Sequence, residues 1–193
     1  MIAIVKYNAG NVRSVQNALH RLGVDAVITD SPEQLRNAEK VIFPGVGEAS
    51  TAMHYLRERG LDAVLKNLHQ PFLGICLGLQ LMCEHSEEAD TDCLGIFDEW
   101  VKRFPTAKQK VPHMGWNNCS VLKEPLFTDI NTSDDFYFVH SYYAELGSQT
   151  TAECDYILPF SAALQKDNFH AVQFHPEKSA DIGQLLIKNF LEL

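Results

Sequence analysis

A strand-to-helix turn around Cys76 constrains the fold of this chain more than any other feature of its sequence. Residues 72–75 are typical of a short buried strand, and residues 77–83 of the first turns of a helix. Cys76 lies at their junction, and Gly74 and Gly78 flank it in the spacing of a nucleophile elbow. Such a turn strains the backbone of the nucleophile and leaves no room for side chains two residues to either side.

The same turn gives Cys76 a chemical role. Its thiol stands at a helix N-terminus, where the positive end of the helix dipole favours the thiolate, the nucleophilic form. A core cysteine packed between two glycines is the simpler alternative. The pattern alone leaves this alternative open, so a catalytic role depends on residues further along the chain.

Strands and helices alternate before the turn. Strands are expected at residues 2–7, 24–29 and 40–43, and helices at 12–22, 51–59 and 61–68, with another helix starting at the Ser31 cap. Alternation at this spacing is typical of βαβ units and a parallel sheet.

The pattern changes after Ser86. An acidic loop at residues 87–92 is followed by strand-like runs at 95–104, 118–122, 136–146 and 150–156. Residues 162–166 and 169–174 predict a hairpin around Asp167 and Asn168, and residues 181–193 a closing helix. We therefore expect one α/β domain over residues 1–193, with a mostly parallel central sheet, flanking helices and added antiparallel strands.

Composition narrows the possible functions. The chain has 25 acidic and 16 basic residues, a formal charge of −9, which argues against binding along a nucleic-acid backbone. No apolar run is long enough to span a membrane, and the N-terminus does not resemble a signal peptide. The five cysteines form no metal-ligand spacing and fit reduced thiols in the cytoplasm. No metal or cofactor is expected.

A second motif supplies the partners that a cysteine nucleophile requires. His175 and Glu177 follow a predicted strand at positions i and i+2, so their side chains are expected on one side. Pro176 restricts the backbone of His175 to extended conformations. Glu177 can then accept a hydrogen bond from one imidazole nitrogen while the other faces Cys76. The combination predicts a Cys76, His175 and Glu177 triad.

With these motifs the chain resembles the class I glutamine amidotransferases, whose triad is Cys, His and Glu in this order. Further stretches along the whole chain resemble one branch of that family, the glutaminase subunits of imidazole glycerol phosphate synthase: residues 11–15, 44–47, 112–117, 137–142 and 175–179. The resemblance implies hydrolysis of glutamine to glutamate and ammonia through a glutamyl thioester. It also implies delivery of the ammonia to a (βα)8-barrel cyclase subunit, in a heterodimer of histidine biosynthesis.

The resemblance also assigns roles around the triad. The N–H of Leu77 and that of Val46 or Gly47 would form the oxyanion hole. The residues expected to hold the substrate are Gln80, Glu88, Ser141 and Tyr142, and those expected at the mouth facing the cyclase are Asn11, Trp116, Tyr137 and Lys178.

One departure from the family and several alternatives remain. Lys6 and Asn8 stand where the family often has Asp and Gly, which leaves open what the lost acid did. The chain could instead be the glutaminase of pyridoxal phosphate, anthranilate or carbamoyl phosphate synthesis, although residues 112–117 argue against these. A catalytically silent binding module would not need an intact triad. A dinucleotide-binding enzyme fails because Ser50 replaces the third glycine of its motif.

Overall fold

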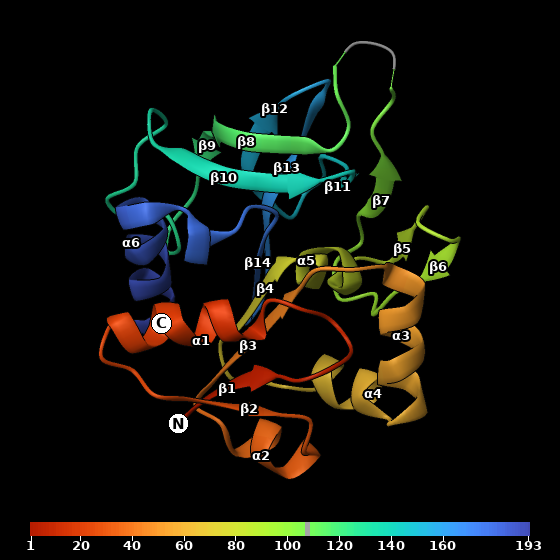
Figure 1. Ribbon diagram of the computed structural model, residues 1–193, viewed down its shortest axis with the longest axis vertical. Helices are drawn as coiled ribbons and strands as arrows, with labels where there is room; N and C mark the ends of the chain where they lie inside the picture. Colours follow the sequence, from red (N-terminus) through yellow and green to blue (C-terminus); the bar gives the residue numbers. More distant parts are fainter. Residues whose placement is uncertain (107–108) are drawn as a thin grey trace.

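The computed structural model describes residues 1–106 and 109–193 of the chain (Figure 1). Its elements alternate between strands and helices up to α5, and strands predominate from there to the final helix. In chain order they are β1 (Ile2–Val5), α1 (Val12–Arg21), β2 (Ala26–Thr29), α2 (Pro32–Asn37), β3 (Lys40–Gly45), α3 (Ala49–Glu58), α4 (Leu61–Lys66), β4 (Phe72–Cys76), α5 (Leu77–Met82), β5 (His85–Ser86), β6 (Thr91–Asp92), β7 (Trp100–Arg103), β8 (His113–Asn118), β9 (Ser120–Leu122), β10 (Asp135–His140), β11 (Tyr142–Ala144), β12 (Thr150–Asp155), β13 (Pro159–Lys166), β14 (Phe169–Val172), the 3-10 turn η1 (Pro176–Lys178) and α6 (Ala180–Leu191).

The parallel half of the main sheet has the order β2-β1-β3-β4-β14. Its central strands β1 and β4 are buried throughout, as expected where helices cover both faces. Successive residues of β1 point to opposite faces of the sheet. Ala3 and Val5 join the core cluster beneath α2, α3 and α4, whereas Ile2 and Ile4 join the cluster beneath α1 and α6. The predicted α/β fold with a mostly parallel centre is confirmed.

Most of the remaining strands extend this sheet, chiefly through antiparallel pairs, although β5 pairs with β7 in parallel and β8 and β10 form a separate two-stranded sheet. The hairpin predicted around Asp167 and Asn168 joins β13 to β14, and Asp167 adopts a left-handed conformation at φ +53°. From β13 the sheet continues through β11, β7, β5 and β6, while β12 and β9 branch from it.

One predicted segment differs from the structure, and one strand was not predicted. Residues 136–146 form two strands in different sheets, because β10 pairs with β8 while β11 pairs with β13 and β7. The chain bends at Ser141, where Nδ1 of His140 donates a hydrogen bond to the Tyr142 carbonyl at 2.7 Å. The sequence pattern did not predict β8, whose residues alternate in exposure beside Gly115 at φ +141°. Figure 1 shows β8 and β10 side by side, above the end of β4.

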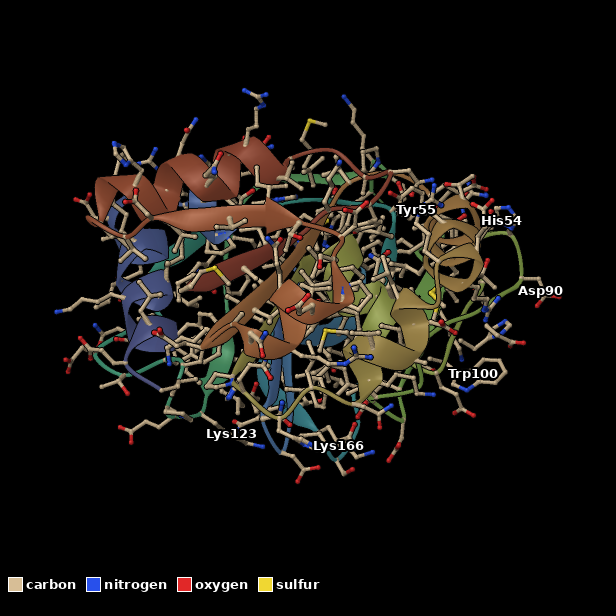
Figure 2. The ribbon with its side chains drawn as sticks, turned by 90° about the horizontal axis from the view of Figure 1, so that it is seen from below. His54, Tyr55, Asp90, Trp100, Lys123 and Lys166 are labelled. Atoms are coloured by element: carbon tan, nitrogen blue, oxygen red, sulfur yellow. The ribbon has the colours of Figure 1, made fainter. Side chains whose placement is uncertain are left out.

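The acidic loop expected at residues 87–92 is a turn at residues 87–90 followed by β6, and a histidine orders it. Nδ1 of His85 bonds Asp92 at 2.9 Å and Nε2 bonds Asp90 at 3.1 Å, and the imidazole ring lies 4.7 Å from the ring of Trp100. The bond to Asp92 raises the pKa of His85. Asp90 and Trp100 both lie at the edge of the molecule (Figure 2), so these interactions fix a surface hairpin.

In the ranges described above, no helix is long and apolar enough to cross a membrane. The five cysteines are free thiols. The same residues contain no group of three His, Cys, Asp or Glu side chains arranged to hold a metal ion.

Candidate active site

The backbone of Cys76 has the strained conformation that an elbow requires. Its φ is +54° and its ψ −107°, at the point where β4 meets α5. The flanking glycines are needed for close packing: a Cβ on Gly78 would lie 1.8 Å from the Phe43 carbonyl oxygen, and one on Gly74 would lie 2.5 Å from the sulfur of Met82. The turn therefore depends on both glycines, for the physical reason that the sequence suggested.

His175 and Glu177 lie together behind the turn, and both side chains are fully buried. Nδ1 of His175 and Oε1 of Glu177 are 2.8 Å apart. This contact leaves Nε2 of His175 as the ring nitrogen available to Cys76, and Nε2 has no hydrogen-bond partner among the described residues. Cys76, His175 and Glu177 are therefore arranged as a nucleophile, a base and a carboxylate that orients the base.

Electrostatics couple the three groups. Burial alone would lower the pKa of His175, but the charge of the nearby Cys76 and the hydrogen bond and charge of the Glu177 carboxylate outweigh burial and raise this pKa to about 10. Burial opposes ionisation of Glu177 as well. The hydrogen bond with His175 and the imidazolium charge nevertheless hold the pKa of Glu177 below its usual value. The site thus favours an imidazolium at His175 beside the carboxylate of Glu177.

Two further side chains hold this pair, and sequence reasoning missed both roles. Nδ2 of Asn11 donates to Oε1 of Glu177 at 2.5 Å, so Asn11 lies behind the carboxylate. The hydroxyl of Ser179 donates to the His175 carbonyl at 2.7 Å and accepts from the Tyr137 N–H at 2.9 Å. The only sequence signal for Ser179 was its place directly after the His175 motif.

The thiol opens into a cavity of about 310 Å³. Its lining includes eight residues predicted for the nucleophile, the oxyanion hole and the substrate: Val46, Gly47, Cys76, Leu77, Gln80, Glu88, Ser141 and Tyr142. It also includes Pro112, Val139 and His140, to which the sequence assigned no role at the site. A cavity of this size can hold an amino-acid side chain together with its backbone groups.

The expected oxyanion donors follow the ends of two neighbouring strands and line the same cavity. Leu77 begins α5 directly after Cys76, and Val46 and Gly47 follow the end of β3, which pairs with β4 at Gly45 and Cys76. The Val46 carbonyl accepts a hydrogen bond from the Gly10 N–H at 3.3 Å, and Gly47 has a φ of +136°, which few residues other than glycine adopt. Both segments can therefore present N–H groups near the sulfur, and their role in an oxyanion hole stays a prediction.

The residues expected to bind substrate occupy different positions. Oε2 of Glu88 accepts from the Ala49 N–H at the start of α3 at 2.8 Å, and burial raises the pKa of Glu88. The carboxylate thus faces the cavity from one side, where it could meet a cationic amine. Gln80 is turned inward and its Nε2 donates to the Tyr142 carbonyl at 2.9 Å. Ser141 and Tyr142 line the same cavity.

Of the four residues expected at the mouth, three lie on the outer side of the site. Trp116 on β8 is 55% exposed, and its ring lies 5.9 Å from the ring of Tyr137 on β10. Lys178 is exposed in η1, next to the triad carboxylate in the chain. Asn11 is the exception, because its side chain points to Glu177. A contact with a partner stays a prediction for all four residues.

Replacing Glu177 by glutamine tests the coupling within the site. The change removes an anion beside His175, so the pKa of His175 is expected to fall from about 10. In the wild type the folded pKa lies above 6.5, so the imidazolium stabilises the fold below pH 6.5, and this contribution is lost as the pH rises from 6.5 to about 10. NMR titration of His175, together with urea unfolding across this range, should show a smaller loss in Glu177→Gln. An unchanged pKa would contradict the coupling.

Comparison with known families agrees with this geometry. The sequence matches the family described as "Glutamine amidotransferase class-I" over residues 3–193. The chain therefore belongs to the class I glutamine amidotransferase family.

Individual relatives indicate one branch of this family. The chain is 62% identical over 194 residues to "Imidazole glycerol phosphate synthase subunit HisH" of Bacteroides fragilis (strain YCH46), with 100% of this chain and 99% of the relative covered. It is 47% identical over 199 residues to the protein of the same description from Vibrio parahaemolyticus serotype O3:K6 (strain RIMD 2210633), with 100% and 98% covered. A solved structure described as "Crystal structure of glutamine amidotransferase" has a TM-score of 0.75 at 22% identity, covers 100% of this chain and 98% of its own, and supports the fold alone. The predicted fold, family and branch are confirmed.

Proposed function

We propose that this chain is the glutaminase subunit of an imidazole glycerol phosphate synthase, and that Cys76, His175 and Glu177 carry its chemistry. The relatives named HisH support the branch. One observation supports the chemistry most directly: the strained Cys76 opens into a cavity while the buried pair of His175 and Glu177 lies behind it. Five free thiols are consistent with a reducing cytoplasm.

The proposed reaction has two halves. The Cys76 sulfur attacks the side-chain amide carbon of glutamine, and His175 takes the thiol proton. The C–N bond then breaks, the nitrogen receives a proton from His175, and ammonia leaves a glutamyl thioester. A water molecule activated by His175 attacks the thioester, the C–S bond breaks, and glutamate leaves a restored thiol. The N–H groups of Leu77 and of Val46 or Gly47 would stabilise both oxyanions, with each donor contributing about 3 kcal/mol.

The substrate would lie between the walls of the cavity. Glu88 offers a carboxylate to the α-ammonium group, and the backbone at Ser141 and Tyr142 offers polar contacts opposite. Gln80 would then act from within the wall, since its amide is already bonded to Tyr142.

The proposed partner is a (βα)8-barrel cyclase that receives the ammonia, and its proposed docking surface lies on β8 and β10. Met114 is 63% exposed and Trp116 55%, so this ribbon presents apolar surface outside the catalytic cavity. Tyr137 is part of β10, and the exposed Lys178 lies in η1, which packs against β10. Asn11 would contribute to this face through its backbone, since its side chain binds Glu177.

Copurification with a barrel subunit tests the proposal. We expect the barrel to bind, and glutamate release to rise on the order of tenfold or more when the barrel and its own ligand are added. The reason is that Gly45 and Gly47 flank Val46 at the oxyanion strand, which leaves its peptide groups able to change orientation beside the docking face. Glutamate release is measured from the chain alone and from the complex. High turnover without the partner, or no binding of the barrel, would contradict the proposal.

A further inference from the structure

Gln173 is a fully buried polar residue that the mechanism above does not use. It lies between β14 and His175, and its backbone N–H donates to the Ala162 carbonyl at 2.8 Å. Its side chain makes two contacts inside the site. Oε1 accepts from Nε2 of Gln80 at 3.0 Å, and Nε2 lies 3.7 Å from the sulfur of Cys76, within hydrogen-bond reach for sulfur. The amide therefore bridges a residue of α5 and the nucleophile.

The direction of these hydrogen bonds follows from one backbone group. The Tyr142 carbonyl can only accept, and it lies 2.9 Å from the Gln80 amide, so the NH₂ group of Gln80 must face it. The same NH₂ group donates to Gln173, so the oxygen of Gln173 must face Gln80. The NH₂ group of Gln173 is then left to face the sulfur. His140 fixes the carbonyl at the start of this chain, because its Nδ1 donates to it at 2.7 Å.

We propose that the side-chain amide of Gln173 is a hydrogen-bond donor to the Cys76 sulfur that stabilises its thiolate form, and that Gln80 holds this amide in the donating orientation. The inference deepens the proposed function and rests on it. A donor aimed at sulfur binds an anion more strongly than a neutral thiol. The thiol itself has a different partner for its proton, the Val139 carbonyl at 3.9 Å. Loss of the proton thus removes the contact with Val139 and strengthens the one with Gln173.

This inference changes the role of Gln80. The sequence resemblance assigned Gln80 to substrate, but its NH₂ group is occupied by Tyr142 and Gln173, and the residue is 5% exposed. A positioning role through Gln173 accounts for this inward orientation.

Three other titratable side chains lie near this sulfur or line the cavity into which it opens. His175 lies on the segment after β14, His140 lines the cavity from the end of β10, and Tyr7 lies in the loop after β1. Burial, and after it the charge of Cys76, raises the pKa of Tyr7, whereas at His175 the charge of Cys76 acts against burial and raises the pKa. None of these residues changes in the variants below.

The test is the rate at which iodoacetamide alkylates Cys76 as a function of pH, measured on the full chain without glutamine and read from the Cys76 peptide by mass spectrometry. Gln173→Glu keeps the shape and the bond from Gln80 but places an acceptor against the sulfur. We expect its alkylation at pH 7 to be about tenfold slower than in the wild type, with the same limiting rate at high pH. Gln70→Leu is the matched control, because it removes a side-chain amide bonded to the Leu35 carbonyl elsewhere.

A profile unchanged in Gln173→Glu would overturn the inference. If this variant does not fold, Gln80→Leu gives the same reading with Gln173 intact, since release of the amide should also slow alkylation at pH 7. A lower limiting rate at high pH, without a shifted midpoint, would indicate a merely structural role and would also overturn the inference. Wild-type glutamate release separates the two proposals: it can succeed while the alkylation profiles contradict a role for Gln173.

Discussion

Replacing Cys76 by alanine is expected to lower glutamate release from the complex with the barrel by about 10⁴-fold or more, because no covalent thioester can form. The fold should tolerate the change. The β4–α5 turn needs its flanking glycines rather than the sulfur. Alanine has the same Cβ as cysteine, so the substitution adds no steric strain at the φ of +54°. Binding to the partner should also survive, since the proposed docking ribbon is β8 and β10. Glutamate release is measured with glutamine in excess.

A second cysteine provides the control for this experiment. Cys93 is partly buried, and its thiol donates to the Thr91 carbonyl at 3.5 Å outside the cavity. Cys93→Ala should therefore keep the wild-type rate. Equal rates for Cys76→Ala and the wild type would remove the enzymatic interpretation and favour a binding module built on the same fold.

Gly78→Ala is expected to destabilise the chain by about 3 kcal/mol, at the upper end for overpacking in a core. The added Cβ would lie 1.8 Å from the Phe43 carbonyl oxygen, which is backbone and cannot rotate away. Helix α5 must then move away from β3, and Cys76 at its start must move with it. We expect a lower free energy of unfolding in urea together with a loss of glutamate release.

Gly60→Ala is the matched control for this change. Gly60 has a positive φ of +63°, but a Cβ built on it meets no atom within 4 Å. Its cost should therefore be only that of a left-handed residue, about 1 kcal/mol, with catalysis unchanged. A Gly78→Ala variant that is no less stable than Gly60→Ala would mean that the elbow does not depend on close packing of α5 against β3.

The first half of the fold could be predicted because its signals are local. Each strand of the parallel sheet is a short apolar run, each helix has an apolar face, and the cap at Ser31 lies where expected. The second half depends on pairing between distant segments. Nothing within residues 136–146 shows that β10 turns to β8 while β11 joins β13 and β7, because the bend at Ser141 depends on a hydrogen bond from His140 to Tyr142.

In the candidate site too, some residues could be predicted from the sequence and others could not. Cys76, His175 and Glu177 could be named because residue type, spacing and backbone restriction point to one chemistry. The oxyanion and substrate residues came from resemblance, and the structure gathers them around one cavity. The orientation of Asn11 toward Glu177 and of Gln80 toward Gln173 could not be predicted, because a buried amide selects its partner from the tertiary surroundings rather than from its neighbours in sequence.

The central claim is that the sulfur of Cys76 attacks glutamine. It is tested most directly by mixing the complex with isotopically labelled glutamine, quenching with acid within one turnover and locating the label by peptide mass spectrometry. The account predicts labelled glutamyl on the peptide that contains Cys76, and none there in Cys76→Ala. Glutamate formed at the wild-type rate without label on Cys76, or with label on another residue, would contradict it.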